Sequence, residues 1–182
     1  EDNVLALARA KGVKPGNITA LVLDRPRHAE LIAAVRRAGA AVRLITDGDV
    51  AGVIHTADPE NTGVDIYLGI GGAPEGVLAA AALRCIGGQM QGRLMFENEE
   101  QVARAREMGV TDPKRIYGIY EMARGNVMFA ATGVTGGPML HGVKRSPGGA
   151  VTHSIVMRSK SGTVRYVEGH HNFARKPAAF IA

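Results

Sequence analysis

The stretch VDIYLGIGGAPEGVLAAAA, residues 64–82, constrains the fold most strongly. An apolar strand pattern runs through a glycine-rich turn into an Ala-rich helix, and Pro74 suits the first turn of that helix. Glu75 is the one carboxylate in the turn. A strand, a glycine turn and a helix N-terminus together let phosphate or metal-bound oxygen approach backbone N–H groups. The segment therefore predicts a strand–turn–helix unit with a ligand site at the turn.

The size of the chain predicts one folded unit over residues 1–182. Of its 182 residues 46% are hydrophobic, which is enough for one sizeable core. The 22 Lys and Arg against 17 Asp and Glu give a net charge of +5, which suits an anionic small molecule as well as nucleic acid. The basic residues are scattered and aromatics make up only 4% of the chain, so we expect no nucleic-acid partner.

The single cysteine, Cys85, excludes an internal disulfide and a Cys-based zinc site, which favours a reducing compartment. No apolar run reaches the roughly 18 residues of a membrane span, and the first residues lack the zones of a signal peptide. We therefore expect a cytoplasmic protein without a membrane partner. The chain also lacks an initiator Met and opens on a helical pattern, so we expect a fragment or a processed product.

Alternating strand and helix patterns predict an α/β fold with a largely parallel sheet. The predicted elements are helix 3–11, strand 19–23, helix 28–38, strand 41–46, helix 50–56, strand 64–70, helix 74–86, an extended segment 89–96, a solvated helix 97–108 and a buried strand 126–132. Residues 151–158 and 163–168 predict an antiparallel hairpin at a sheet edge. Ligands bind outside the carboxyl ends of parallel strands, so segments 24–28, 47–49 and 71–76 should converge on one crevice.

Arg25 and Arg27 flank Pro26 after the first predicted strand. Two guanidinium forks on a loop stiffened by proline suit phosphate, through charge-assisted bonds that are often bidentate. The alternative is a surface loop with solvated arginines.

Asp47 and Asp49 flank Gly48 after the second predicted strand. Their carboxylates can ligate a cation or accept hydrogen bonds from sugar hydroxyls, and the alternative is that an Asp caps the next helix. Glu75 lies at the positive end of a helix dipole. It either complements that dipole or ligates a hard cation, since Mg²⁺ prefers one or two carboxylates with phosphate oxygens and water.

The sequence gives little support for a dinucleotide-binding site or for a metal site made of histidines. GIGGAPEG does not match the dinucleotide-binding pattern GxGxxG with its expected spacing. The six histidines show no metal-ligand spacing, so we expect structural or solvated roles for His28, His55, His141, His153, His170 and His171.

Six motifs occur in order over residues 10–168, namely DRPRH, DGDV, GIGGAPEG, GGQMQGRL, ATGVTGGPML and HSIVMRSKSGTVRY. In these motifs the chain resembles the C-terminal half of class II (GlpX-type) fructose-1,6-bisphosphatases. The resemblance implies a layered αβαβα sandwich of the sugar phosphatase superfamily, a need for Mg²⁺ or Mn²⁺, and removal of the 1-phosphate of fructose 1,6-bisphosphate in gluconeogenesis. It assigns the 6-phosphate to Arg25 and Arg27, with Pro26 between them in the substrate-binding segment. It assigns the sugar to Asp47, Gly48, Asp49 and Gly72, and a metal to Glu75.

One departure from the family concerns catalysis. The family's N-terminal half supplies most metal carboxylates, a DPxxGT-type segment with its threonine, and a tyrosine that contacts the substrate, and none has a counterpart here. We therefore expect no catalytic residue in this chain, no activity from it alone, and an N-terminal half in the same or a second chain within a homo-oligomer, a dimer or tetramer. Alternatives are sedoheptulose 1,7-bisphosphate as substrate, a noncatalytic sugar-phosphate binding module, and a structural subunit.

Overall fold

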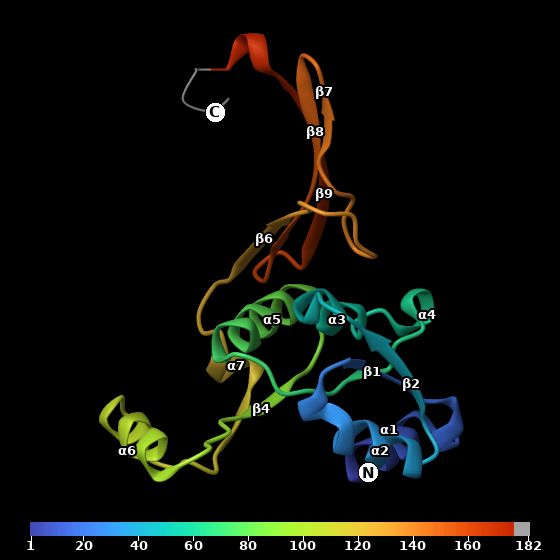
Figure 1. Cartoon of the computed structure of the whole chain (residues 1–182), viewed down its shortest axis with the longest axis vertical. Coiled ribbons are helices and arrows are strands. Elements are labelled where there is room, and N and C mark those ends of the chain that lie inside the picture. The colour runs from blue at the N-terminus through green and yellow to red at the C-terminus, as the bar shows by residue number, and fades with distance from the viewer. Residues whose placement is uncertain (177–182) are drawn as a thin grey trace.

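A three-stranded parallel sheet forms the base of the fold in the computed structural model, which describes residues 1–176 (Figure 1). Residues 177–182 of the predicted unit lie outside this range. The strands are β1 (Thr19–Leu23), β2 (Ala41–Ile45) and β3 (Ile66–Tyr67), in the order β2-β1-β3. The register pairs Thr19 with Ala41 and Ala20 with Ile66. The central strand β1 is the most buried, as its unbroken apolar run TALVL predicts.

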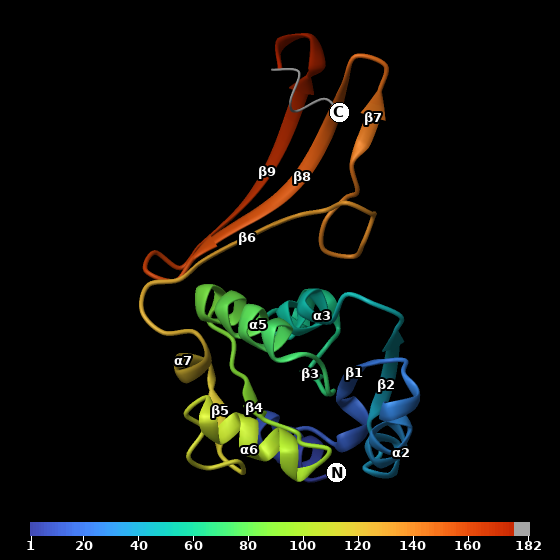
Figure 2. The ribbon, with the colours of Figure 1, turned by 60° about the vertical axis from the view of Figure 1, so that its left-hand side comes forward.

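Helices cover both faces of this sheet (Figures 1 and 2). On one face α1 (Asp2–Lys11) and α2 (Ala29–Arg37) pack through a buried cluster of Val4, Ala8, Ile18, Ala20, Val35 and Ala40. On the other lie α3 (Asp49–His55) and α5 (Ala73–Ile86). Gly52 lets α3 approach closely, since a Cβ there would lie 2.8 Å from Leu21 Cδ2. The connections include the short helices η1 (Pro15–Asn17), η2 (Pro26–His28) and α4 (Pro59–Thr62).

An antiparallel sheet packs on the outer side of α3 and α5. Its strands are β6 (Met128–Thr132), β7 (Lys144–Ser146), β8 (Gly149–Arg158) and β9 (Thr163–Asn172), followed by η3 (Phe173–Arg175). The shared core contains Ile54, Ala82, Cys85, Phe129, Leu140, Ile155 and Met157. Because α5 is packed between two layers, it needs small apolar residues around much of its surface, which explains its Ala-rich sequence.

The remaining elements project from the base. Strands β4 (Gln91–Arg93) and β5 (Ile116–Gly118) form an antiparallel ribbon that carries α6 (Glu99–Glu107), and α7 (Ile119–Met122) returns the chain to α5 (Figure 2). Helix α6 buries none of its residues, which confirms the predicted solvated helix. Among residues 1–176, every helix is too short or too polar to cross a membrane.

The α/β class is confirmed, and four layers are present in the described residues: helices, parallel sheet, helices and antiparallel sheet. Three predictions were wrong in detail. The parallel sheet stops at β3, because β6 pairs antiparallel with β8. The hairpin is longer than predicted and β8 is interior, with β6 and β7 along one side and β9 along the other. Strand β3 has two residues instead of seven, because the glycine-rich residues 68–72 between it and α5 form no strand.

Candidate functional site

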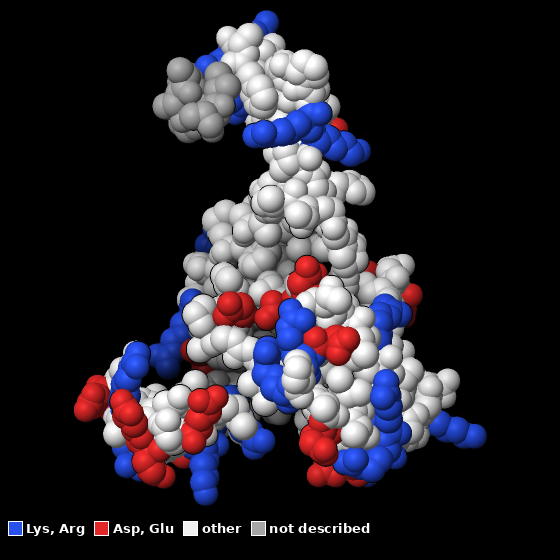
Figure 3. Space-filling view, viewed as in Figure 1, with Lys and Arg blue, Asp and Glu red and all other residues white. Residues whose placement is uncertain are grey.

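The three predicted loop segments meet at the carboxyl ends of β1, β2 and β3, which confirms that they converge. We call this meeting point of the three segments the strand-end crevice. Arg25 reaches from the end of β1 to the end of β2, where its Nη2 donates to the Thr46 carbonyl at 2.6 Å. Arg27 reaches the loop after β3, where its Nε donates to the Ile70 carbonyl at 3.0 Å. In Figure 3, basic and acidic side chains lie next to each other in the middle of the molecule, below the antiparallel sheet.

The two arginines differ in how much of the guanidinium remains exposed to a ligand. Arg25 is half-buried and donates from both terminal nitrogens, Nη1 to the Asp24 carbonyl at 2.9 Å and Nη2 to Thr46. Arg27 is exposed and uses only Nε, so its two Nη groups make no hydrogen bond within the described residues. Pro26 begins η2 and separates the two side chains. Arg27 therefore offers the more open fork for an anion.

The Asp47–Asp49 turn brings the Asp49 carboxylate to the loop after β3. Gly48 is the N-cap of α3 and takes the left-handed conformation, with φ 77°, so the alternative that an Asp caps the helix is wrong. Asp49 begins α3, and its Oδ1 accepts from the Val50 amide at 2.9 Å. Its Oδ2 faces the glycine loop, 3.4 Å from where a Cβ on Gly71 would stand. Asp47 is exposed.

Glu75 lies in the first turn of α5, and its carboxylate folds back over the N-cap residue Gly72. A Cβ on Gly72 would overlap Glu75 Oε2 and lie 3.1 Å from Cδ. The carboxylate is exposed at the positive end of the helix, and a hard divalent cation accepts such an oxygen donor. Residues 1–176 contain no group of three His, Cys, Asp or Glu side chains able to hold a metal. Glu75 is thus an exposed oxygen donor that has no two further metal-ligating side chains beside it in the described residues.

Two residues of the crevice were missed as site residues. His28 is fully buried, and its ring contacts both the Leu23 carbonyl and the Ile70 amide. Burial raises the pKa of Tyr67 to about 12, the nearby Asp49 carboxylate adds to the rise, and Arg27 opposes it. The Tyr67 hydroxyl therefore stays protonated at neutral pH. Tyr67 lies inside an apolar strand pattern, so only its place at the end of the strand hints at a site.

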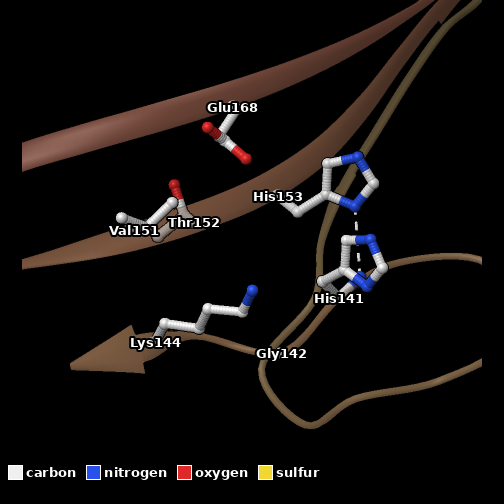
Figure 4. Close-up of a pocket in the computed structure, with 7 residues that line it drawn as sticks. All are labelled: His141, Gly142, Lys144, Val151, Thr152, His153 and Glu168. Atoms are coloured by element: carbon white, nitrogen blue, oxygen red, sulfur yellow. Dashed lines mark hydrogen bonds between the residues drawn. The ribbon is translucent and has the colours of Figure 1, made fainter.

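A hollow lies on the antiparallel sheet, away from the strand ends (Figure 4). The His141 amide donates to His153 Nδ1 at 3.1 Å, and the two rings stack with centroids 4.8 Å apart. Lys144, Thr152 and Glu168 complete its polar lining. The hollow contains none of the predicted site residues, so the strand-end crevice is the candidate site.

Comparison with known proteins places the chain in a family. The sequence model of the family described as "Bacterial fructose-1,6-bisphosphatase, glpX-encoded" matches residues 1–171. Two relatives are named "D-fructose 1,6-bisphosphatase class 2/sedoheptulose 1,7-bisphosphatase". The protein from Microcystis aeruginosa is 46% identical over 171 residues, 87% of this chain and 49% of the relative. The protein from Synechococcus elongatus is 46% identical over 169 residues, 86% of this chain and 49% of the relative.

The chain thus spans about half the length of the curated relatives that it matches. The family match covers the motifs that carry the resemblance noted in the sequence, from DRPRH to HSIVMRSKSGTVRY, and every residue of the strand-end crevice. The chain belongs to the family of glpX-encoded bacterial fructose-1,6-bisphosphatases.

Proposed function

We propose that the chain supplies the sugar-phosphate side, and one metal ligand, of an enzyme that hydrolyses the 1-phosphate of fructose 1,6-bisphosphate to fructose 6-phosphate and phosphate. One observation carries the proposal: in a chain of this family, Arg27, Asp49 and the glycine loop that leads to Glu75 meet at one end of a parallel sheet. Such an end is where open α/β sheets bind ligands.

Each part of the crevice has a role in this proposal. Arg25 and Arg27 hold the 6-phosphate, chiefly through the open fork of Arg27, and Pro26 lies between them in the substrate-binding segment. Arg25 also keeps the ends of β1 and β2 together. Asp47, Gly48, Asp49 and Gly72 hold the sugar, since carboxylates and backbone groups accept and donate the hydrogen bonds that hydroxyls need. Holding both ends of the sugar phosphate orients the reacting phosphoester.

Glu75 is the residue of this chain that would hold the divalent metal, Mg²⁺ or Mn²⁺. When bound, such a cation stabilises negative charge on phosphoryl oxygens. The contribution of the protein is to present the Glu75 carboxylate in a defined place, and the bare N-cap at Gly72 leaves room for it.

The proposal extends to partners and location. The 1–182 unit is the C-terminal half of the active enzyme, and an N-terminal half, in the same or a second chain, supplies the catalytic residues and the other metal carboxylates. The complete enzyme is a homo-oligomer, a dimer or tetramer, and works in gluconeogenesis in the cytoplasm.

A second substrate, sedoheptulose 1,7-bisphosphate, is favoured by the names of both relatives, which include sedoheptulose 1,7-bisphosphatase. The two substrates share a phosphorylated sugar end, and the crevice grips that shared part. A noncatalytic sugar-phosphate binding module is the alternative from another class. It would keep its affinity for fructose 6-phosphate when Mn²⁺ is omitted and release no phosphate in any form.

The test is Mn²⁺-dependent phosphate release from both bisphosphates, by the protein in its full natural length, with and without Glu75→Gln. We expect release by the unaltered protein, and a fall in kcat of about 100-fold or more in the variant, the scale expected when a group that stabilises transition-state charge is lost. Glu99→Gln is the matched control, because Glu99 is an exposed acid in the first turn of the projecting helix α6. No release from either substrate would overturn the proposal.

A further inference from the structure

We propose that His28 is a positioning residue, which sets the distance between the phosphate-binding segment and the glycine loop that leads to Glu75. The inference rests on the proposed function and deepens it. His28 itself is fully buried and touches no ligand surface, so it acts through the backbone that it holds.

The evidence begins with the peptide groups on either side of the ring. His28 Nδ1 lies 2.8 Å from the carbonyl of Leu23, the last residue of β1. A carbonyl only accepts, so Nδ1 carries the proton and donates. Nε2 is then the acceptor, and the Ile70 amide donates to it at 2.9 Å. One ring therefore ties the end of β1 to the loop after β3.

Arg27 binds the carbonyl group of Ile70, the residue whose amide binds His28. Its Nε donates to the Ile70 carbonyl at 3.0 Å, while His28 accepts from the Ile70 amide. The same carbonyl lies 3.2 Å from His28 Nε2, but Arg27 supplies its donor. Two consecutive residues of η2 thus bind both backbone polar groups of Ile70. Because only Nε of Arg27 donates in this contact, its two Nη groups stay open for the sugar phosphate.

The grip extends along the loop to the metal ligand. Gly69 lies beside the ring: a Cβ there would be in ordinary contact with His28 Cε1, at 3.5 Å, and in tight contact with the Tyr67 hydroxyl, at 3.2 Å. One residue after Ile70, Gly71 faces Asp49, and two residues after it, Gly72 lies under the Glu75 carboxylate. A shift of the Ile70 peptide therefore moves Glu75 relative to Arg27.

Two variants at His28 separate its two hydrogen bonds. An Asn side chain places its amide nitrogen near Nδ1 and keeps the donor to Leu23, but it does not reach Ile70. A Gln side chain places its amide oxygen near Nε2 and keeps the acceptor for Ile70. In the full-length protein with fructose 1,6-bisphosphate and Mn²⁺, we expect His28→Asn to lower kcat by about 10- to 100-fold with a smaller change in KM. His28→Gln should keep kcat within about threefold of the unaltered protein.

His171→Asn is the control, since His171 is a partly buried histidine bonded to Thr152 on the antiparallel sheet. It should leave kcat and KM unchanged. If His28 is merely structural, both His28 variants lower the Tm and neither changes kcat. Equal loss of kcat in the Asn and Gln variants would also overturn the proposal.

Hydrogen exchange of the peptide covering residues 68–72 provides a readout that does not depend on activity. Exchange should accelerate about 10-fold or more in His28→Asn and stay near that of the unaltered protein in His28→Gln. If the unaltered protein hydrolyses neither bisphosphate, the proposed function fails, and the exchange result alone decides on His28. Equal exchange in all three forms would show that His28 does not hold the loop.

Discussion

A glycine suits position 72 because the Glu75 carboxylate fills the space where a side chain at that position would lie. The backbone at Gly72 has φ −67°, which any residue can adopt, so conformational freedom does not explain the glycine. The position of the Glu75 carboxylate explains the glycine instead. A Cβ on Gly76, four residues later and within α5, would meet no atom within 4 Å, so that glycine has no such constraint.

We therefore predict that Gly72→Ala displaces the Glu75 carboxylate and raises the Mn²⁺ concentration needed for half-maximal activity by about 10-fold or more. A Mn²⁺ titration of phosphate release measures this. Gly76→Ala should leave the titration unchanged and raise stability by about 0.5–1 kcal/mol, because alanine favours helix. Equal Mn²⁺ requirements in the two variants would contradict the prediction.

At the scale of elements, Asp65 joins helix α1 to the two strands on which it packs. It precedes β3, accepts from the Thr19 amide of β1 at 2.8 Å, and forms an ion pair with Lys11 at the end of α1. Burial raises the pKa of the Asp65 carboxyl, but the bonds from Lys11 and Thr19 outweigh burial, so the pKa is lowered. Folding therefore favours the ionised carboxylate.

A carboxyl whose pKa is lowered by folding stabilises the protein above its unfolded pKa, near 3.9, and loses this contribution as the pH falls through the lower folded value. We predict that Asp65→Asn costs about 1 kcal/mol at pH 7, with part of the ion pair screened by solvent. The difference should shrink below about pH 4. Urea unfolding across pH measures it. Glu60→Gln is the control, because Glu60 is exposed on α4, and its free energy of unfolding should match that of the unaltered protein at every pH. If the stability difference for Asp65→Asn grew in acid instead of shrinking, the prediction would be wrong.

At the scale of the whole molecule, three buried clusters hold the described layers together. The first lies between the parallel sheet and helices α1 and α2, the second lies between α3, α5 and the antiparallel sheet, and the third joins α3, α5 and α7. Met157 belongs to the second core, where it is fully buried with Ala82 and Cys85. Met128 on the neighbouring strand β6 is 69% exposed. The antiparallel sheet is thus attached through one of its faces.

We predict that Met157→Ala destabilises the protein by about 2–4 kcal/mol, because it leaves a cavity between the sheet and α5. Met128→Ala should change the free energy of unfolding by no more than about 0.5 kcal/mol. Denaturant unfolding compares the two. Similar values for both variants would mean that the sheet is not attached through this core.

Much of the fold was predictable because periodicity reports which face of an element is buried. Strand 19–23 and helix α5 lie where their patterns place them, and the strand ends bring Arg27, Asp49 and Gly72 into the predicted crevice. Partner strands were not predictable. The pattern of β6 reads the same in a parallel as in an antiparallel sheet, since an alternating or apolar run carries no direction.

Local patterns were enough to establish the α/β class, the residues at the strand ends and, through six ordered motifs, the family. Such patterns are properties of the sequence itself and do not depend on which segments come into contact in the folded protein. The folded structure was needed to show that Arg25 spends its guanidinium on backbone carbonyls, that Arg27 keeps an open fork, and that His28 holds Ile70. The contacts with Thr46 and Ile70 join residues 21 to 43 positions apart, and no local pattern specifies which distant carbonyl or amide a side chain will meet.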